Sequence, residues 1–69
     1  MEKSEAAEWM KENLKLGDQI NAMFEKANTL KSDSDIRAMR FNISQVIVAI
    51  DENLFRPIIR EFPDLDPHR

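Results

Sequence analysis

The chain has no cysteine, one glycine, three prolines and one histidine among its 69 residues. Without cysteine, it can form neither disulfide bonds nor zinc sites built on thiolates. A chain of this length has room for one domain and buries only about 60% of the surface that its unfolded form exposes, so a single core is marginal. Of the usual remedies for a small domain, oligomerisation is the one that remains.

A strong excess of one charge and long apolar runs are missing as well. Ten basic and thirteen acidic residues give a formal net charge of −3, which does not favour binding to a nucleic-acid backbone. The longest apolar run, from Val46 to Ile50, is far shorter than the ~20 residues that span a bilayer. The first residues do not lead into the apolar stretch of a secretory signal. We therefore expect a cytoplasmic protein that does not insert into a membrane.

The scarcity of helix breakers before Pro57 favours long helices. Between residues 5 and 30, a row of residues recurs in steps of three and four, as on one face of an α-helix. This row is Trp9, Asn13, Leu16, Ile20, Met23, Ala27 and Leu30, with Ala6, Met10 and Phe24 on one flank. The sequence predicts a first helix over about 5–30.

Two residues in or beside this row, Asn13 and Gly17, do not carry an apolar side chain. Asn13 could fix the register of a helical assembly, but its position near the helix start favours a side chain that reaches water. Gly17 either permits the close approach of a neighbouring backbone or is simply tolerated, at a cost to helix stability of about 1 kcal/mol. The sequence does not separate these two roles of Gly17.

A short polar stretch separates the first helix from a second one, predicted over about 33–56. Ser32 and Asp35 have the spacing of a capping box, and Ser34 is another candidate cap. So short a connection folds the helices into an antiparallel hairpin. Within the second helix, Glu52 and Arg56 have the spacing of an ion pair. The apolar positions that predict this helix are Ile36, Met39, Ile43, Ile47, Ile50 and Leu54. The stretch 41–50 could also be a buried strand, but no other segment offers a partner for it.

A second apolar row runs along the second helix. Phe41, Val48, Phe55 and Phe62 repeat at intervals of seven, about 140° around the helix from the isoleucine row. One facing helix cannot cover both rows. Two copies of the hairpin packed as a four-helix bundle would cover both, and we expect this homodimer. A docking groove for a different protein is the alternative.

The C-terminal segment is richer in proline. Pro57 should stop or kink the second helix and begin a short helical turn over 57–62, which Pro63 ends. We expect this segment to cap the open end of the bundle, and a recognition motif for a partner is the alternative. The residues predicted to form an interface, with a second copy or with another protein, are Phe41, Val48, Phe55, Ile58, Ile59 and Phe62.

No catalytic, metal or cofactor site is predicted. Asp64, Asp66 and His68 alternate as metal ligands can, but they lie in a proline-flanked tail. Glu5, Glu8 and Glu12 share a helical face, but the chain lacks the Glu-x-x-His motifs of metal sites in helical bundles. Four arginines could clamp an anion, although pairing with nearby acids is the expectation. They are Arg37, Arg40, Arg56 and Arg60.

These patterns predict an all-α protein without enzymatic activity, a small interaction or adaptor protein that acts as a homodimer. An RNA- or DNA-binding regulator built as a hairpin dimer is the first alternative, and only the shape of the fold supports it. A small enzyme with its site between subunits is the second, and no acid–base constellation supports it.

Overall fold

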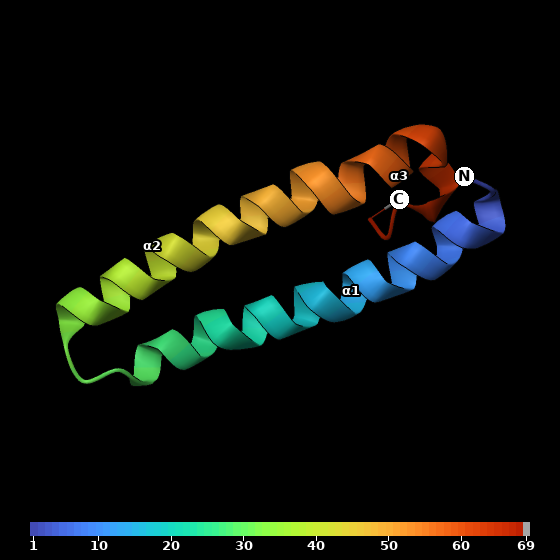
Figure 1. Cartoon of the computed structure of the whole chain (residues 1–69). Coiled ribbons are helices and arrows are strands. Elements are labelled where there is room, and N and C mark those ends of the chain that lie inside the picture. The colour runs from blue at the N-terminus through green and yellow to red at the C-terminus, as the bar shows by residue number, and fades with distance from the viewer. Residues whose placement is uncertain (69) are drawn as a thin grey trace.

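The structure is a computed structural model that describes residues 1–68, and it shows two long antiparallel helices (Figure 1). Helix α1 spans Lys3–Lys26 and ends in a 3₁₀ turn at Ala27–Thr29. After a short connection, helix α2, Asp33–Ile50, returns beside α1. The predicted all-α hairpin is therefore confirmed, and the stretch 41–50 is helical.

The chain remains helical after α2. Asp51–Phe55 form a π turn, helix α3 covers Arg56–Glu61, and Pro63–Leu65 form a last 3₁₀ turn. This C-terminal segment folds back at the end of the hairpin where the N-terminus lies (Figure 1). The molecule is a rod of 47 × 19 × 16 Å. Within residues 1–68, no helix combines the length and apolar character needed to cross a bilayer.

Polar side chains fix the helix ends at the connection. Thr29 Oγ1 donates a hydrogen bond to the carbonyl of Lys26, 2.7 Å away. Ser32, a predicted cap of α2, accepts a hydrogen bond from the backbone N–H of Asp35 at 3.4 Å. Such contacts satisfy backbone groups that a helix end leaves without partners, and they define where the chain reverses.

The inner face of α1, which packs against α2 and against the C-terminal segment, is only partly the predicted one. Its buried and half-buried residues are Ala6, Met10, Asn13, Gly17, Ile20, Phe24 and Ala27. Trp9, Leu16 and Met23, which the sequence placed on this face, are exposed. Because α1 is apolar around a wide arc, periodicity leaves its orientation open. Gly17 lies on the observed face, where a Cβ would be 4.0 Å from Cζ of Phe55.

Helix α2 faces α1 through the predicted isoleucine row. Ile43 is buried, and Ile36, Ile47 and Ile50 are half-buried. Met39 and Leu54, which belong to the same predicted set, are exposed. Arg40 lies in the isoleucine row, and its guanidinium carbon is 4.8 Å from the centre of the Phe24 ring of α1. In this cation–π contact the guanidinium covers one face of the ring. The contact places Phe24 and Arg40 at about the same height along the hairpin, near the connection.

The chain does not leave the helical conformation at Pro57. Instead, the turn just before Pro57 is a π turn, which is wider than an α turn. Proline has no N–H for the carbonyl of residue 53, and its ring meets that carbonyl in a regular α-helix. In the π turn, the N–H of Arg56 bonds instead to the carbonyl of Asp51. Arg56 Nε also donates to Asp51 Oδ2 at 2.7 Å, so the expected pair with Glu52 is replaced by one at π spacing. This hydrogen bond, and then the charge of Asp51, raise the pKa of Arg56 above its ordinary value.

Candidate interaction surfaces

The C-terminal segment packs onto the start of α1 through an apolar cluster. Its buried members are Ala6, Met10 and Ile58, and the partly buried residues around them are Phe55, Ile59, Phe62 and Leu65. We call these seven residues the end cluster. Four of the six residues predicted for an interface thus pack within the chain itself, and the segment lies over the open end of the hairpin, where a cap was predicted.

Two ion pairs join the same parts of the chain. Lys3 Nζ pairs with Asp64 Oδ2, and the N-terminal ammonium lies 3.6 Å from Glu61 Oε1. These groups are exposed, and exposed pairs contribute at most about 1 kcal/mol each. The apolar contacts, rather than the ion pairs, therefore hold the C-terminal segment in place.

A buried polar contact connects α1 to the π turn. Asn13 is 4% exposed, and its Nδ2 donates a hydrogen bond to the carbonyl oxygen of Leu54 at 2.7 Å. The interpretation that Asn13 reaches water was wrong, because the C-terminal segment packs against this end of α1. Within residues 1–68, no buried side-chain nitrogen or oxygen lacks a hydrogen-bond partner. The hydrogen bond therefore offsets the cost of burying the amide.

The π turn also separates Phe55 from the row of Phe41 and Val48. Phe41 and Val48 are 65% and 54% exposed, whereas Phe55 packs in the end cluster. A π turn holds one residue more than an α turn, so the residues after it are rotated by about 100°. Intervals of seven therefore do not keep these side chains on one face, and the exposed row ends at Val48.

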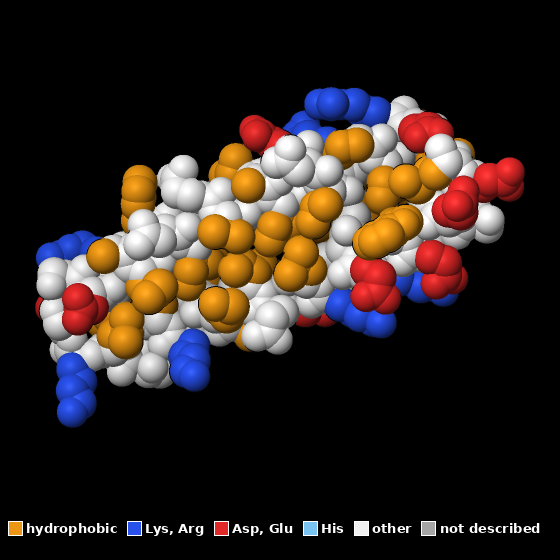
Figure 2. All heavy atoms as spheres, in the orientation of Figure 1, with side chains coloured by type: hydrophobic (Ala, Val, Ile, Leu, Met, Phe, Trp, Pro, Cys, Tyr) orange, Lys and Arg blue, Asp and Glu red, His pale blue; other side chains and the backbone are white. Residues whose placement is uncertain are grey.

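Most of the exposed large apolar residues lie on one side of the hairpin. Except for Leu30, which lies in the connection, they directly precede residues on the inner side of the hairpin. In an antiparallel pair this places both rows on the same side. The first row is Trp9, Leu16, Met23 and Leu30, and the second is Met39, Val46 and Leu54. The last step is eight instead of seven, as the extra residue of the π turn requires. We call this side the Trp9 face, and an apolar band runs along both helices there (Figure 2).

The opposite side of the hairpin carries a groove of about 410 Å³ between the helices. Apolar residues such as Ile20 and Ile47 form part of its lining, and Asp18, Asp51 and Asp66 add carboxylates. His68 also lies there, so the tail follows this side of the hairpin. No residue of the Trp9 face lines the groove. Among residues 1–68, no group of three or more histidines and acids is placed to hold a metal ion.

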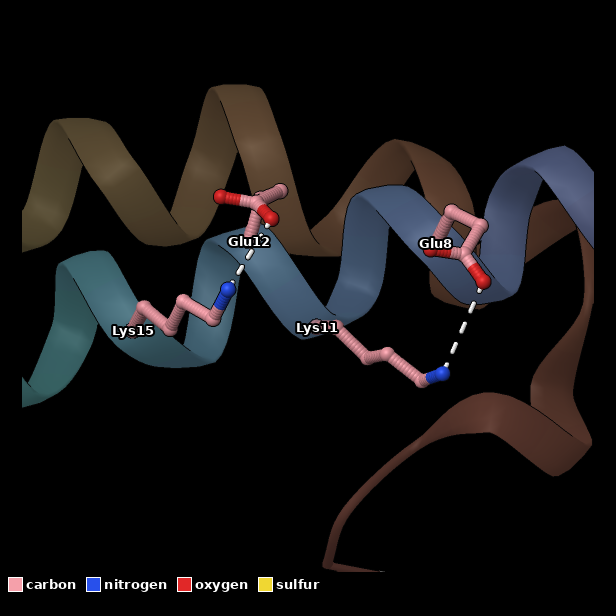
Figure 3. Close-up of polar contacts among 4 residues, drawn as sticks. All are labelled: Glu8, Lys11, Glu12 and Lys15. Atoms are coloured by element: carbon pink, nitrogen blue, oxygen red, sulfur yellow. Dashed lines mark hydrogen bonds and ion pairs between the residues drawn. The ribbon is translucent and has the colours of Figure 1, made fainter.

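The start of α1 is acidic beside the Trp9 face. Three glutamates surround a shallow hollow together with Trp9: Glu5, Glu8 and Glu12. Two of them pair along the helix, Glu8 with Lys11 at 3.5 Å and Glu12 with Lys15 at 3.2 Å (Figure 3). Exposed pairs of this kind are weak and exchange partners readily. Glu8 and Glu12 thus remain available to a second molecule, whereas Glu5 accepts a hydrogen bond from the backbone N–H of Glu2 at 2.8 Å.

The fold defines an all-α helical hairpin with apolar residues exposed on more than one side. No family model, curated protein or solved structure matches the chain. Its function must therefore be inferred from these surfaces.

Proposed function

We propose that this chain is a non-enzymatic helical interaction protein that acts as a homodimer. The observation that carries the proposal is the accessible surface of the single chain, 5358 Å². A compact monomer of 8.1 kDa has about 4,500 Å² by the scaling of folded proteins. The excess of about 900 Å² is close to the roughly 800 Å² that each partner buries in a standard interface.

The small core of the single chain supports the same proposal. Its buried apolar residues are Ala6, Met10, Ala27, Ile43 and Ile58, and no large side chain in residues 1–68 is fully buried. Cores of domains this small rarely supply more than about 3–5 kcal/mol of stability. Two hairpins packed face to face as a four-helix bundle would enlarge the core with residues that are now exposed. The proposal includes a cytoplasmic location and neither a catalytic nor a cofactor site.

Sedimentation equilibrium at micromolar concentration tests the homodimer. We expect a mass of twice 8.1 kDa, together with the circular dichroism spectrum of a helical protein. A stable, folded monomer over this concentration range would contradict the proposal. Unfolding midpoints should also rise with protein concentration, because association stabilises the folded state by mass action.

The row of Phe41 and Val48 is the surface that we assign to a different protein. Both side chains are more than half exposed, and they lie outside the Trp9 face. A pull-down from native extract should compare the wild-type chain with a Phe41→Asp, Val48→Asp double variant. A specific protein retained by the first and lost by the second supports the adaptor role, provided that both forms have the same oligomeric mass. Equal retention by both argues against this surface.

A further inference from the structure

We propose that the second copy docks on the Trp9 face, antiparallel to the first, so that the two-fold axis passes close to Val46. This inference rests on the proposed homodimer and specifies its surface and geometry. It differs from the sequence-based prediction, which placed the interface along the row of Phe41 and Val48.

The spacing of the Trp9 face is that of a helix-packing surface. Trp9, Leu16 and Met23 repeat at seven in α1, and Leu30 follows in the connection. The second row repeats at seven and then at eight, where the π turn adds a residue. Apolar residues scattered singly over a surface need no explanation, but two aligned rows on one side form a continuous patch. Residues spaced by seven on two neighbouring helices fit between the side chains of another helical pair. The occupant that matches both rows is therefore a helical hairpin.

Two contacts set the register between the helices. Asn13 lies level with Leu54, and Phe24 lies level with Arg40. Counting inward from both contacts, Val46 is level with about residue 19 of α1. The two rows of the Trp9 face are therefore centred at the same height along the rod.

This common centre makes the Trp9 face complementary to itself. A two-fold axis at that height sets Leu16 opposite Met23 of the second copy, and Trp9 opposite the connection that carries its Leu30. Val46 then meets Val46 of the second copy at the axis. A surface that meets an identical surface in this way is what a two-fold dimer requires, so a second copy of this chain fits the face without any other partner.

The charges beside the face favour the antiparallel arrangement. Glu5, Glu8 and Glu12 lie in the first half of α1, whereas Lys26 ends α1 and Lys31 lies in the connection that follows. In the antiparallel dimer the acidic start of one α1 lies beside the basic end of the other. Two parallel hairpins would instead gather both acidic starts at one end of the bundle, where like charges repel.

Single cysteines test the geometry, because the natural chain has none to interfere. A disulfide needs Cα atoms about 4.4–6.8 Å apart, which only residues close to the axis satisfy. We expect mild oxidation to convert most of a Val46→Cys variant into a covalent dimer that a reductant reverses. Val48→Cys is the matched control and should remain largely uncrosslinked. If Val46→Cys crosslinks no more than Val48→Cys, the proposed axis is wrong.

A pair of aspartate variants tests the face by affinity. Val46→Asp sets two charges against each other in a desolvated interface, and dimerisation should weaken by about a hundredfold or more. Val48→Asp, on the outer side of α2, should leave the dimer mass unchanged. A dimer that Val48→Asp dissociates and Val46→Asp leaves intact would overturn the inference. If Val46→Asp loses its helical spectrum, the crosslinking of Val46→Cys decides.

The two proposals fail in different ways. A wild-type chain that stays monomeric contradicts the homodimer itself. A wild-type dimer that neither Val46 variant affects contradicts only the assignment of the Trp9 face.

Discussion

Asn13 in α1 donates a hydrogen bond from its Nδ2 to the carbonyl oxygen of Leu54, 41 residues further along the chain and 2.7 Å away. The carbonyl belongs to the π turn, where the regular hydrogen-bond ladder is interrupted before Pro57. The contact therefore does more than satisfy a buried amide. It sets the register between the two long helices at the end of the hairpin that the C-terminal segment covers.

Replacing Asn13 should show how much this hydrogen bond contributes to the stability of the protein. Asn13→Ala should lower the free energy of unfolding by about 1–3 kcal/mol, because the buried bond is lost. Urea denaturation at a fixed protein concentration measures the change. Asn21 is exposed in the same helix, so Asn21→Ala is the matched control and should change stability by less than about 0.5 kcal/mol.

Asn13→Asp should make stability depend on pH. The new carboxylate would face a carbonyl oxygen without a donor, so its folded-state pKa should rise above the ordinary value of about 3.9. A group with a raised folded pKa contributes stability below its unfolded pKa and loses it as pH rises through the folded pKa. The loss relative to Asn13→Ala should therefore be largest at pH 7 and shrink toward pH 4. Equal urea midpoints of the two variants at both pH values would contradict this.

Phe41 and Phe55 provide a matched pair for the rotation caused by the π turn. They belong to one row by their spacing, but Phe55 packs in the end cluster while Phe41 is 65% exposed. Phe55→Ala should cost about 2–4 kcal/mol of stability, and Phe41→Ala less than about 0.5 kcal/mol. Thermal and urea denaturation of both variants measure this. Equal losses would mean that the two side chains share an environment.

Two truncations test how much the end cluster contributes. Ending the chain after Arg56 removes Ile58 and its neighbours, uncovers Met10, and should lower the melting temperature by ten degrees or more, on the order of 2–5 kcal/mol. Ending it after Leu65 keeps the whole end cluster and should change melting little. Unchanged melting of the shorter chain would show that the C-terminal segment is not a cap.

Gly17→Ala should stabilise the protein. A Cβ at this position would lie 4.0 Å from Cζ of Phe55, an ordinary van der Waals contact, and alanine is favoured over glycine inside a helix by about 0.5–1 kcal/mol. The urea midpoint should rise accordingly. Gly17→Leu is the control, because its longer side chain must displace the Phe55 ring and should destabilise. A loss of stability in Gly17→Ala would mean that the helices need glycine at this approach.

Apolar spacing alone does not determine which side of α1 is buried. Trp9 and Met10 are adjacent, both are large and apolar, and each belongs to a row with steps of three and four. Only the parts of the chain that pack against α1 select between the rows, and the C-terminal segment buries Met10 and leaves Trp9 exposed. Gly17 lies on the selected face although it adds no apolar side chain. A count of apolar spacing therefore could not find this face.

The residues predicted to form one interface are separated in the structure, and sequence spacing could not show this either. Phe41, Val48, Phe55 and Phe62 share one face only in an unbroken α-helix. Pro57 predicts that the helix stops or kinks, and it does not by itself predict an added residue in the preceding turn. That residue turns Phe55 toward α1 and leaves Phe41 and Val48 outside.

By itself, the sequence determined an all-α hairpin, because few breakers, helical spacing and one short capped connection act locally. It determined the C-terminal apolar segment as well, since Pro57 and Pro63 delimit it. Only the tertiary structure decided which side of α1 is buried, that Asn13 bonds to Leu54, and that Phe55 leaves the row of Phe41. These outcomes depend on contacts between residues far apart in the chain. The hydrophobic effect favours the burial of any apolar side chain and does not itself specify which side of a helix is buried.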